Sequence, residues 1–361
     1  MANVDVGTPR FYCDYVNYLL SRGVASSAFA LTATNTGANI TAALTSGTAA
    51  ELFDMKPLNQ VTFTTNTGDA NADHILLTFD LHTDGFKPDF VAILNHNMHT
   101  ADADFRIAYD DTLGHLQAVD HAASTRIVPT RVLGACTITE SDDNDVAGND
   151  HVITRPTADG HTIVKFTGVA SRYWGIQICG NAGENDNEFD GTTNLSIGCI
   201  LLGQYYDMPH SPDMTIKRSI VFDGVKINKS LGGQRYGTIT NTGRSGKNAN
   251  LSPFQTYNTT SDLGVYGGRM SYDLAFSYLN STDVMPNEYH TPQSADSAVV
   301  EDVWNKTNGR HIPFIFSIDK SSEGDDAESE HMFARFGQDS LDMGQVAHKL
   351  WNIQMKIDEE F

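Results

Sequence analysis

The stretch FVAILNHNMHTADADFRIAY, residues 90–109, contains the pattern on which this sequence is built: an apolar run, a polar turn and an alternating run. A short apolar run bounded by turn residues predicts a strand buried on both faces, and alternation with a period of two predicts a half-buried strand. Asn and His after the first run tolerate the left-handed backbone of a turn. The stretch therefore predicts two strands of a sandwich joined by a polar loop.

Short apolar or alternating runs of this kind, separated by clusters of Gly, Asn and Asp, recur through the first half of the chain. Such spacing of strands and turns is typical of an antiparallel β-sandwich. The predicted strands are residues 59–66, 75–82, 90–95, 104–109, 162–168 and 173–179.

The second half of the chain predicts longer strands. Residues 271–279 place Tyr272, Leu274, Phe276 and Tyr278 on one face, and the terminal segment 350–361 repeats this alternation. We expect these two strands to pair with each other. Residues 313–318 predict a further, buried strand.

One helix is predicted between these strands, over residues 294–310. Its apolar stripe consists of Val299, Val300, Val303 and Trp304, at the spacing of a helix face. Gly309 follows where a helix commonly ends on a glycine.

The length of 361 residues indicates two domains. Prolines at positions 209 and 212 place the boundary near residue 210. The predicted fold class is mainly β, with two antiparallel, jelly-roll-like β-sandwich domains at residues 26–210 and 211–361 and one helix in the second. Residues 1–25, rich in aromatic residues and too short to bury them, predict an N-terminal arm that lies on something else. Residues 228–256, rich in Gly, Asn and Ser, predict a second arm.

The net charge of −21 argues against nucleic acid as a partner, because such binding depends on Lys and Arg that neutralise phosphates. Basic residues nevertheless gather locally, with a single acid, Asp223, among them. We weigh two interpretations: a cluster on a solvated face, or a patch that docks on an acidic surface of a neighbouring subunit. The basic residues are Lys217, Arg218, Lys226, Lys229, Arg235, Arg244 and Lys247.

His96 and His99, with Asp102 and Asp104 downstream, offer imidazole and carboxylate groups that could bind a metal. A His-x-x-His pair is weak on its own, because a zinc site needs third and fourth ligands in fixed geometry. The alternative, which we favour, is that the segment is only a turn between two sandwich strands.

Two acidic loops are candidates for calcium binding. Asp143 and Asp145 lie in SDDNDVAGND (141–150), and Glu184 and Asp186 lie in GENDNEFDG (183–191). The first resembles half of an EF-hand loop, but Thr154 stands where the bidentate Glu belongs. The alternative in both cases is a solvated acidic loop, and no other cofactor is expected.

Motifs of catalysis are not found: the sequence has no GxSxG, HExxH, Walker A or strand-linked GxGxxG pattern. We therefore predict that the protein is not an enzyme. No apolar segment of membrane-spanning length occurs, and the first residues lack the basic and apolar regions of a secretory signal. We expect neither a membrane span nor secretion.

Three segments together resemble structural proteins of tailed bacteriophages. These are TPRFYCDYVNYL (8–19), the opening stretch, and SRYWGIQICGNAGENDNEFDGTTNLSIGCILLGQYYDMP (171–209); the resemblance covers roughly residues 8–25 and 60–210. In that family an apolar strand ends in Asn-His-Asn, and an Arg-Tyr-Trp strand leads through an acidic loop to Ile-Gly and Leu-Gly-x-Tyr. The resemblance implies a galactose-binding-like jelly roll, a scaffold used for sugars and for assembly. RYGTITNTGRSG (235–246) and PFIFSID (313–319) match such proteins more loosely, and the acidic insertion after the latter departs from them.

The resemblance implies a non-enzymatic virion component of the tail tip, baseplate or fibre, assembled in the host cytoplasm. Its partners would be other virion proteins and copies of itself. The arm aromatics would pack against a neighbour and the basic residues would meet its acidic surface. The predicted assembly residues are Phe11, Tyr12, Tyr15, Tyr18, Arg235, Arg244 and Lys247.

Two alternatives remain on the same scaffold. A carbohydrate-binding adhesin for a host-surface glycan would use His96, Asn97, Arg172 and Tyr173, since sugar sites combine aromatic rings with hydrogen-bonding side chains at loop ends. A capsid decoration protein is the other alternative, and composition does not separate it from a tail component.

Overall fold

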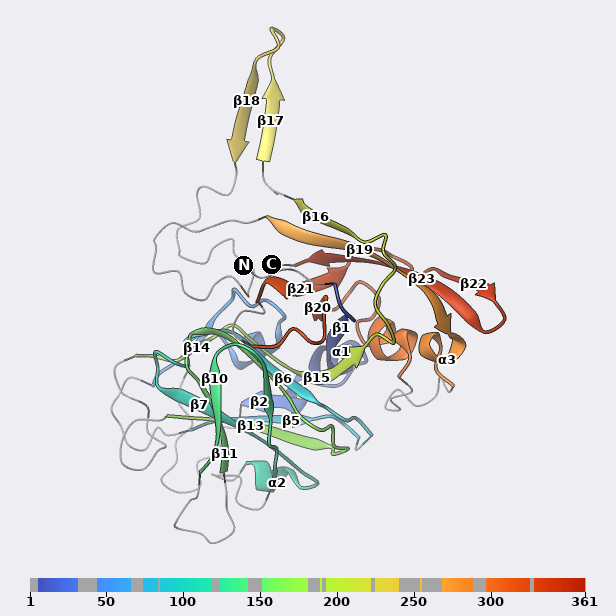
Figure 1. The fold of residues 1–361 in the computed structure, drawn as a ribbon. Helices are drawn as coiled ribbons and strands as arrows, with labels where there is room; N and C mark the ends of the chain where they lie inside the picture. Colours follow the sequence, from blue (N-terminus) through green and yellow to red (C-terminus); the bar gives the residue numbers. More distant parts are fainter. Residues whose placement is uncertain are drawn as a thin grey trace.

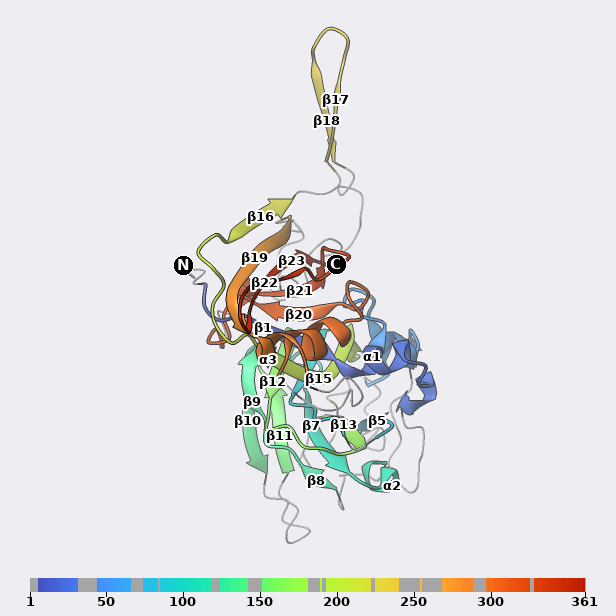
Figure 2. The same ribbon diagram turned by 90° about the vertical axis from the view of Figure 1, so that its right-hand side faces the viewer.

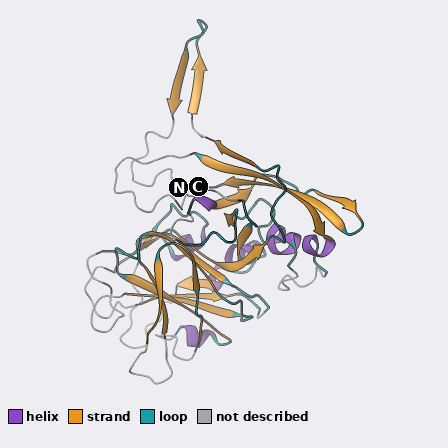
Figure 3. Cartoon of the chain, in the orientation of Figure 1, coloured by secondary structure: helices purple, strands orange, loops and turns teal. Residues whose placement is uncertain are grey.

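The structure is a computed structural model (Figures 1 and 3). It is mainly β, with several antiparallel sheets, which confirms the predicted fold class at that level. Its arrangement is consistent with a β-sandwich. The described residues are 6–31, 44–65, 74–83, 85–117, 124–141, 151–180, 189, 193–221, 225–239, 254, 268–287, 297–324 and 328–360.

The largest sheet contains strands from both halves of the chain. Its members are β1 (Arg10–Asp14), β6 (Phe90–His96), β9 (Thr130–Leu133), β12 (Gly160–Lys165), β15 (Cys199–Asp207), β16 (Lys217–Val221), β19 (Arg269–Asn280), β20 (Phe314–Ser317), β21 (His331–Phe336), β22 (Met343–Ala347) and β23 (Leu350–Glu359). Their spatial order is β16-β19-β23-β21-β20-β1-β15-β6-β12-β9, and β22 also pairs with β23.

A second sheet comes from the first half of the chain alone. Its strands are β2 (Phe29–Leu31), β5 (His74–Asp80), β7 (Ala103–Asp110), β8 (Thr125–Arg126), β10 (Cys136–Ser141), β11 (His151–Pro156) and β13 (Tyr173–Gly180). The order is β10-β11-β7-β13-β5-β2, with β8 on β7.

The remaining elements are small. A three-stranded sheet contains β3 (Leu44–Ser46), β4 (Val61–Phe63) and β14 (Ser196–Ile197), and a separate hairpin consists of β17 (Val225–Lys229) and β18 (Arg235–Ile239). The helices are α1 (Tyr15–Ser21), α2 (Leu113–Leu116), α3 (Ser281–Val284), a π-helix (Val300–Asn305) and three short 3₁₀ turns (Ser26–Ala28, Ala49–Phe53 and Glu328–Glu330). None of the helices in the described ranges has both the length and the apolar character that crossing a membrane requires.

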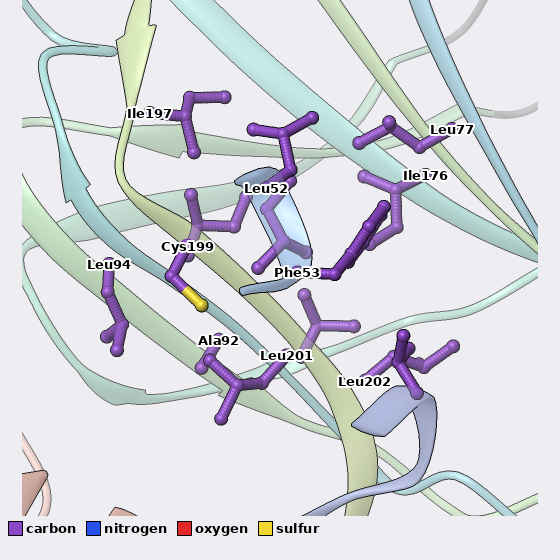
Figure 4. Close-up of a cluster of buried hydrophobic side chains, with 14 of the residues drawn as sticks. Leu52, Phe53, Leu77, Ala92, Leu94, Ile176, Ile197, Cys199, Leu201 and Leu202 are labelled. Atoms are coloured by element: carbon purple, nitrogen blue, oxygen red, sulfur yellow. The ribbon is translucent and has the colours of Figure 1, made fainter. Parts of the chain in front are cut away.

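The first hydrophobic core lies between β6, β12 and β15 of the large sheet and β5, β7 and β13 of the second sheet. Figure 4 shows part of it, where Leu52 and Phe53 lie between Cys199 of the large sheet and Ile176 of the second. All seven residues of β6 are buried: the apolar run Phe90–Leu94 predicts this, and the polar Asn95 and His96 are buried with it. This core fixes the position of the polar turn that follows β6.

The second core gathers one face of β19 and β23 under α3 and the π-helix. β19 pairs with β23 in antiparallel register, which confirms the predicted pairing. The predicted stripe is wrong at its last residue. The register shifts between Phe276 and Leu279, Tyr278 has a positive φ of 62° and is 69% exposed, and Leu279 is buried in its place. A bulge of this kind re-aims a side chain.

The predicted helix is confirmed over a shorter range, residues 299–305, where it is almost entirely a π-helix, and turns follow to residue 310. Val299 and Val303 are fully buried, and Trp304 packs on Phe336 with ring centroids 5.0 Å apart. Gly309 has the left-handed φ of 64° expected of the glycine that ends a helix.

The N-terminal segment is not an arm, and this prediction is wrong for the described residues. β1 lies between β15 and β20 and pairs with both. Phe11 and Cys13 point into the second core, while Tyr12 points into the first. The strand therefore joins the two cores, one composed mostly of residues before position 210 and the other mostly of residues after it.

Candidate assembly surface

The Asn-His-Asn segment at the end of β6 is held by hydrogen bonds to two other segments. The side chain of Asn95 donates to the carbonyl of Pro57 at 2.8 Å. That of Asn97 accepts from the amide of Ser196 at 2.6 Å and donates to the carbonyl of Asn194 at 2.9 Å. Asn95 and Asp102 have positive φ values of 52° and 45°. The segment is a structural turn, as the favoured interpretation proposed.

His96 is buried inside this turn rather than presented at its surface. Its Nδ1 accepts from the backbone N–H of Met98 at 3.3 Å, so the hydrogen lies on Nε2, which is 2.9 Å from the hydroxyl of Thr162. Burial lowers the pKa of His96 to about 3, and the neighbouring His161 adds to the effect. The imidazole is therefore neutral at ordinary pH, and both of its ring nitrogens are hydrogen-bonded within the protein.

The metal candidates do not come together. His96 is buried and His99 is exposed, so their side chains face different environments. Asp104 is buried and 3.2 Å from Arg155. Among the residues that the structure describes, there is no group of three His, Cys, Asp or Glu side chains that could hold a metal ion. The calcium candidates Asp143, Asp145, Glu184 and Asp186 lie outside the described residues.

The glycan candidates lie at opposite ends of the sandwich. Tyr173 begins β13 opposite Asp110, whereas the far end of β13 pairs with Ala103, next to the turn that contains His96 and Asn97. The two ends are roughly 23 Å apart, at about 3.3 Å per residue of strand. The four candidates therefore do not form one site.

Arg172 is committed to an ion pair rather than free for a sugar. Its Nε and Nη2 donate to the two carboxylate oxygens of Asp80 at 2.8 and 2.9 Å, and its guanidinium lies 4.9 Å from the ring centroid of Tyr173. This forked pair holds the pKa of Asp80 below its usual range, with the Arg172 hydrogen bonds as the main cause.

The four N-terminal aromatics that we expected to contact a neighbour are all buried within their own chain. Phe11 and Tyr12 are in β1, and Tyr15 and Tyr18 are in α1, with exposed fractions between 0% and 4%. They are core residues here, because the two cores supply the apolar surface that the segment lacks by itself.

The hairpin of β17 and β18 is exposed along its described length. It forms a sheet of its own and stands away from the body in both views (Figures 1 and 2). Every described side chain from position 226 to 238 is exposed. The strands pair from Val225 with Ile239 to Lys229 with Arg235. Among the described residues, none from position 226 to 238 belongs to either core.

The hairpin presents cations and apolar groups together. Ile227, Lys229 and Arg235 share one face by register, while Lys226 and Tyr236 share the other. Ile227 is 64% exposed and Tyr236 is 54% exposed. Large apolar side chains that remain in water on both faces of a basic element indicate a surface used for contact with a partner.

The tip of the hairpin is a closed turn that ends in an apolar side chain. Ser230 accepts from the amide of Gly233 at 2.9 Å, and its own amide donates to the carbonyl of Gln234 at 2.8 Å. Gly233 has a left-handed φ of 84°, which suits glycine. Leu231 is fully exposed at the tip.

The predicted basic cluster is only partly described. Lys226, Lys229 and Arg235 lie on the hairpin, while Lys217 and Arg218 lie on the exposed strand β16. The remaining two basic residues, Arg244 and Lys247, lie outside the described residues. The cluster is thus carried by two neighbouring exposed elements rather than by one flat face.

A cavity of about 710 Å³ lies beside α1 and the π-helix. Arg22, Asp80 and His82 contribute to its wall, together with Glu301 and Asn305 from the π-helix. Glu301 is only 4% exposed and accepts from the side-chain amide of Asn305 at 3.1 Å. This is the second candidate site of the described chain.

Sequence reasoning missed a buried charged network under this cavity. Lys306, 1% exposed, donates to Asp302 at 2.7 Å and to Gln204 at 2.9 Å, and Tyr15 donates to the same Gln204 oxygen at 2.6 Å. The spacing of Asp302 and Lys306 predicts a helical ion pair, but such pairs are usually solvated. Only the fold shows that this one joins α1, β15 and the π-helix.

No protein-family model matches this sequence, and comparisons with curated proteins and with solved structures also return no match.

Proposed function

We propose that this chain is a non-enzymatic structural component of a tailed-phage virion, in the tail tip, baseplate or fibre region, which acts by subunit–subunit assembly. It would be assembled in the host cytoplasm, with other virion proteins and copies of itself as partners. The virion assignment rests on the sequence resemblance. The assembly role rests on one structural observation, the projecting hairpin of β17 and β18.

An isolated two-stranded hairpin is only marginally stable in water, because it lacks a third strand or a packed face. The hairpin of β17 and β18 exposes Ile227, Leu231 and Tyr236 while the rest of the described chain buries two cores. A surface that covers these side chains would stabilise the hairpin and remove apolar area from water. Assembly supplies such a surface.

The finer fold that we propose is a galactose-binding-like jelly roll in the first half of the chain. In support, β15, β6 and β12 face the antiparallel strands β7, β13 and β5 across one core. This scaffold serves assembly as well as sugar binding, so it is compatible with the proposed role without deciding it.

The test is the mass and shape of the purified chain, by light scattering and small-angle X-ray scattering over a concentration series, with and without calcium. We expect a concentration-dependent oligomer. A compact monomer at every concentration would contradict the assembly role. Detection of the chain by mass spectrometry and antibody labelling in purified phage particles tests the virion assignment, and the labelled position distinguishes a tail component from a capsid decoration protein.

A carbohydrate-binding adhesin is the second candidate, because the cavity beside α1 offers groups that bind sugar hydroxyls. It combines the carboxylate of Glu301 with the guanidinium of Arg22 and the amide of Asn305. A glycan array with the parent and with Glu301→Gln tests it. Binding that the substitution abolishes supports the adhesin, and an array without signal contradicts it.

A further inference from the structure

We propose that the partner of the hairpin is a second copy of this same chain, whose acidic body receives the basic, apolar tip. The inference rests on the proposed function of assembly and names the partner at that surface. The elements that make the contact are β17, β18 and the turn between them, residues 225–239.

Charge complementarity favours a second copy. Residues 225–239 contain Lys226, Lys229 and Arg235 and no Asp or Glu, so the hairpin has a charge of +3. Subtracting these three charges from the net −21 leaves −24 on the remainder of the chain. Two copies repel overall, since each carries −21, but the basic element is attracted locally by the acidic body of the other copy, and this attraction selects the orientation of the contact.

The same charges disfavour contact between two hairpins. Lys229 and Arg235 already lie directly opposite each other within one hairpin. Like charges across a strand pair are destabilising, and a four-stranded sheet formed from two hairpins would bring six cations together. The acidic body of the partner, in contrast, would neutralise the pair of cations at the base of the tip.

The geometry directs the hairpin away from its own body. Both views show it projecting beyond β16 and the sheet edge (Figures 1 and 2). Leu231 at the tip and Ile227 and Tyr236 along the strands are the apolar groups that a neighbour would cover. Hairpin and body are different surfaces, so each copy can give one contact and receive another, which is the arrangement that generates closed rings or longer assemblies.

The experiment compares two charge-reversed triple variants of the full chain. One carries Lys226→Glu, Lys229→Glu and Arg235→Glu in the hairpin. The other carries Lys56→Glu, Lys87→Glu and Lys349→Glu, which replace exposed lysines elsewhere and change the net charge by the same amount. Sedimentation velocity measures the self-association constant of each variant over the same series of protein concentrations, at about 0.05 and about 0.5 M salt.

We expect the hairpin triple variant to raise the dissociation constant at low salt at least tenfold relative to the parent, and the control triple variant to change it less than threefold. The difference between the parent and the hairpin triple variant should shrink at high salt, because the attraction between exposed charges is screened. If the parent self-associates and both triple variants weaken it equally, the hairpin is not the contact, while assembly as such stands. If the parent does not self-associate at all, the proposed function fails together with the inference.

The identity of the contacted surface is read by placing a photo-crosslinker at position 231. The exposed side chain of Leu231 has no role in either core, so the substitution does not threaten folding. Crosslinked dimers whose second peptide comes from the body support the inference. Crosslinks confined to a second hairpin overturn it.

Discussion

Two segments of this chain are predicted to be arms, residues 1–25 from their aromatic residues and residues 228–256 from their Gly, Asn and Ser, and their described parts differ in opposite ways. Residues 10–14 form β1, with all five side chains buried between two cores. Residues 225–239 form a hairpin whose described side chains are exposed. The difference teaches that the aromatic content of a segment indicates burial, whereas it does not reveal whether its own chain or a neighbour supplies the covering surface.

The largest expected difference between the two segments is in core packing. Phe11→Ala in β1 removes a ring whose centroid is 5.6 Å from that of Phe314 and 5.2 Å from that of Phe316. We expect it to lower the free energy of unfolding by about 3–5 kcal/mol, since it leaves a cavity. Denaturant unfolding measures this. Leu231→Ala is the matched control and should stay within about 0.5 kcal/mol of the parent. Equal losses would mean that the hairpin is packed as firmly as β1.

Replacing a buried cation should also lower the free energy of unfolding more than replacing an exposed one. Lys306→Met leaves Asp302 as an uncompensated buried charge, and we expect it to cost about 3 kcal/mol of unfolding free energy. The double variant Asp302→Leu with Lys306→Met should recover most of that loss, because no charge then remains without its partner. Lys226→Met in the hairpin should leave thermal unfolding unchanged. A loss that the double variant fails to recover would show that Lys306 acts through other contacts.

The buried His161 should make the free energy of unfolding decrease in acid. Burial lowers the pKa of His161 from 6.5 to about 3, so below pH 6.5 the unfolded chain takes up a proton that the folded chain refuses. Stability is full above pH 6.5 and falls by about 1.4 kcal/mol per pH unit below it for each such histidine. Asp14 opposes this, since burial raises its pKa to about 6, but it is common to parent and variant.

The variant His161→Phe keeps a ring against Phe254, whose centroid is 5.1 Å away in the parent, and cannot titrate. Between pH 6 and 4, we expect the dependence of its unfolding free energy on pH to be about 1.4 kcal/mol per pH unit shallower than that of the parent. Urea unfolding at several pH values measures the slope. Parallel slopes would contradict the lowered pKa of His161.

The smallest expected effect is that of removing the hairpin. Replacing residues 225–239 by a short Gly-Ser linker deletes a two-stranded sheet that is outside both cores. We expect the unfolding free energy of the dilute monomer to change by less than about 0.5 kcal/mol. A larger loss, seen by urea unfolding at low protein concentration, would show that the hairpin supports the body.

Each strand predicted from periodicity overlaps a strand of the structure, because burial on one or two faces leaves a direct pattern. The pairing of β19 with β23 and the glycine at position 309 followed from such local rules. Tyr278 was misplaced because a bulge shifts the register, and nothing in the alternation signals that shift.

The place of β1 could not be deduced, because its partners β15 and β20 come from distant parts of the chain. The aromatic side chains of a strand between two cores become buried only when both cores are formed.

The candidate site was predictable only as a basic cluster. Its apolar side chains, Ile227 and Tyr236, are ordinary strand residues in the sequence, and only their exposure in the fold distinguishes them.

Hydrogen–deuterium exchange of β1 and of the hairpin, in dilute and in concentrated solution, tests the central comparison most directly. The amides of β1 should be protected in both conditions, since they are hydrogen-bonded inside the largest sheet. Those of residues 226–238 should exchange rapidly when the chain is dilute and become protected as it assembles. Hairpin amides that are equally protected at every concentration would contradict the claim that this element acquires its stability from a partner.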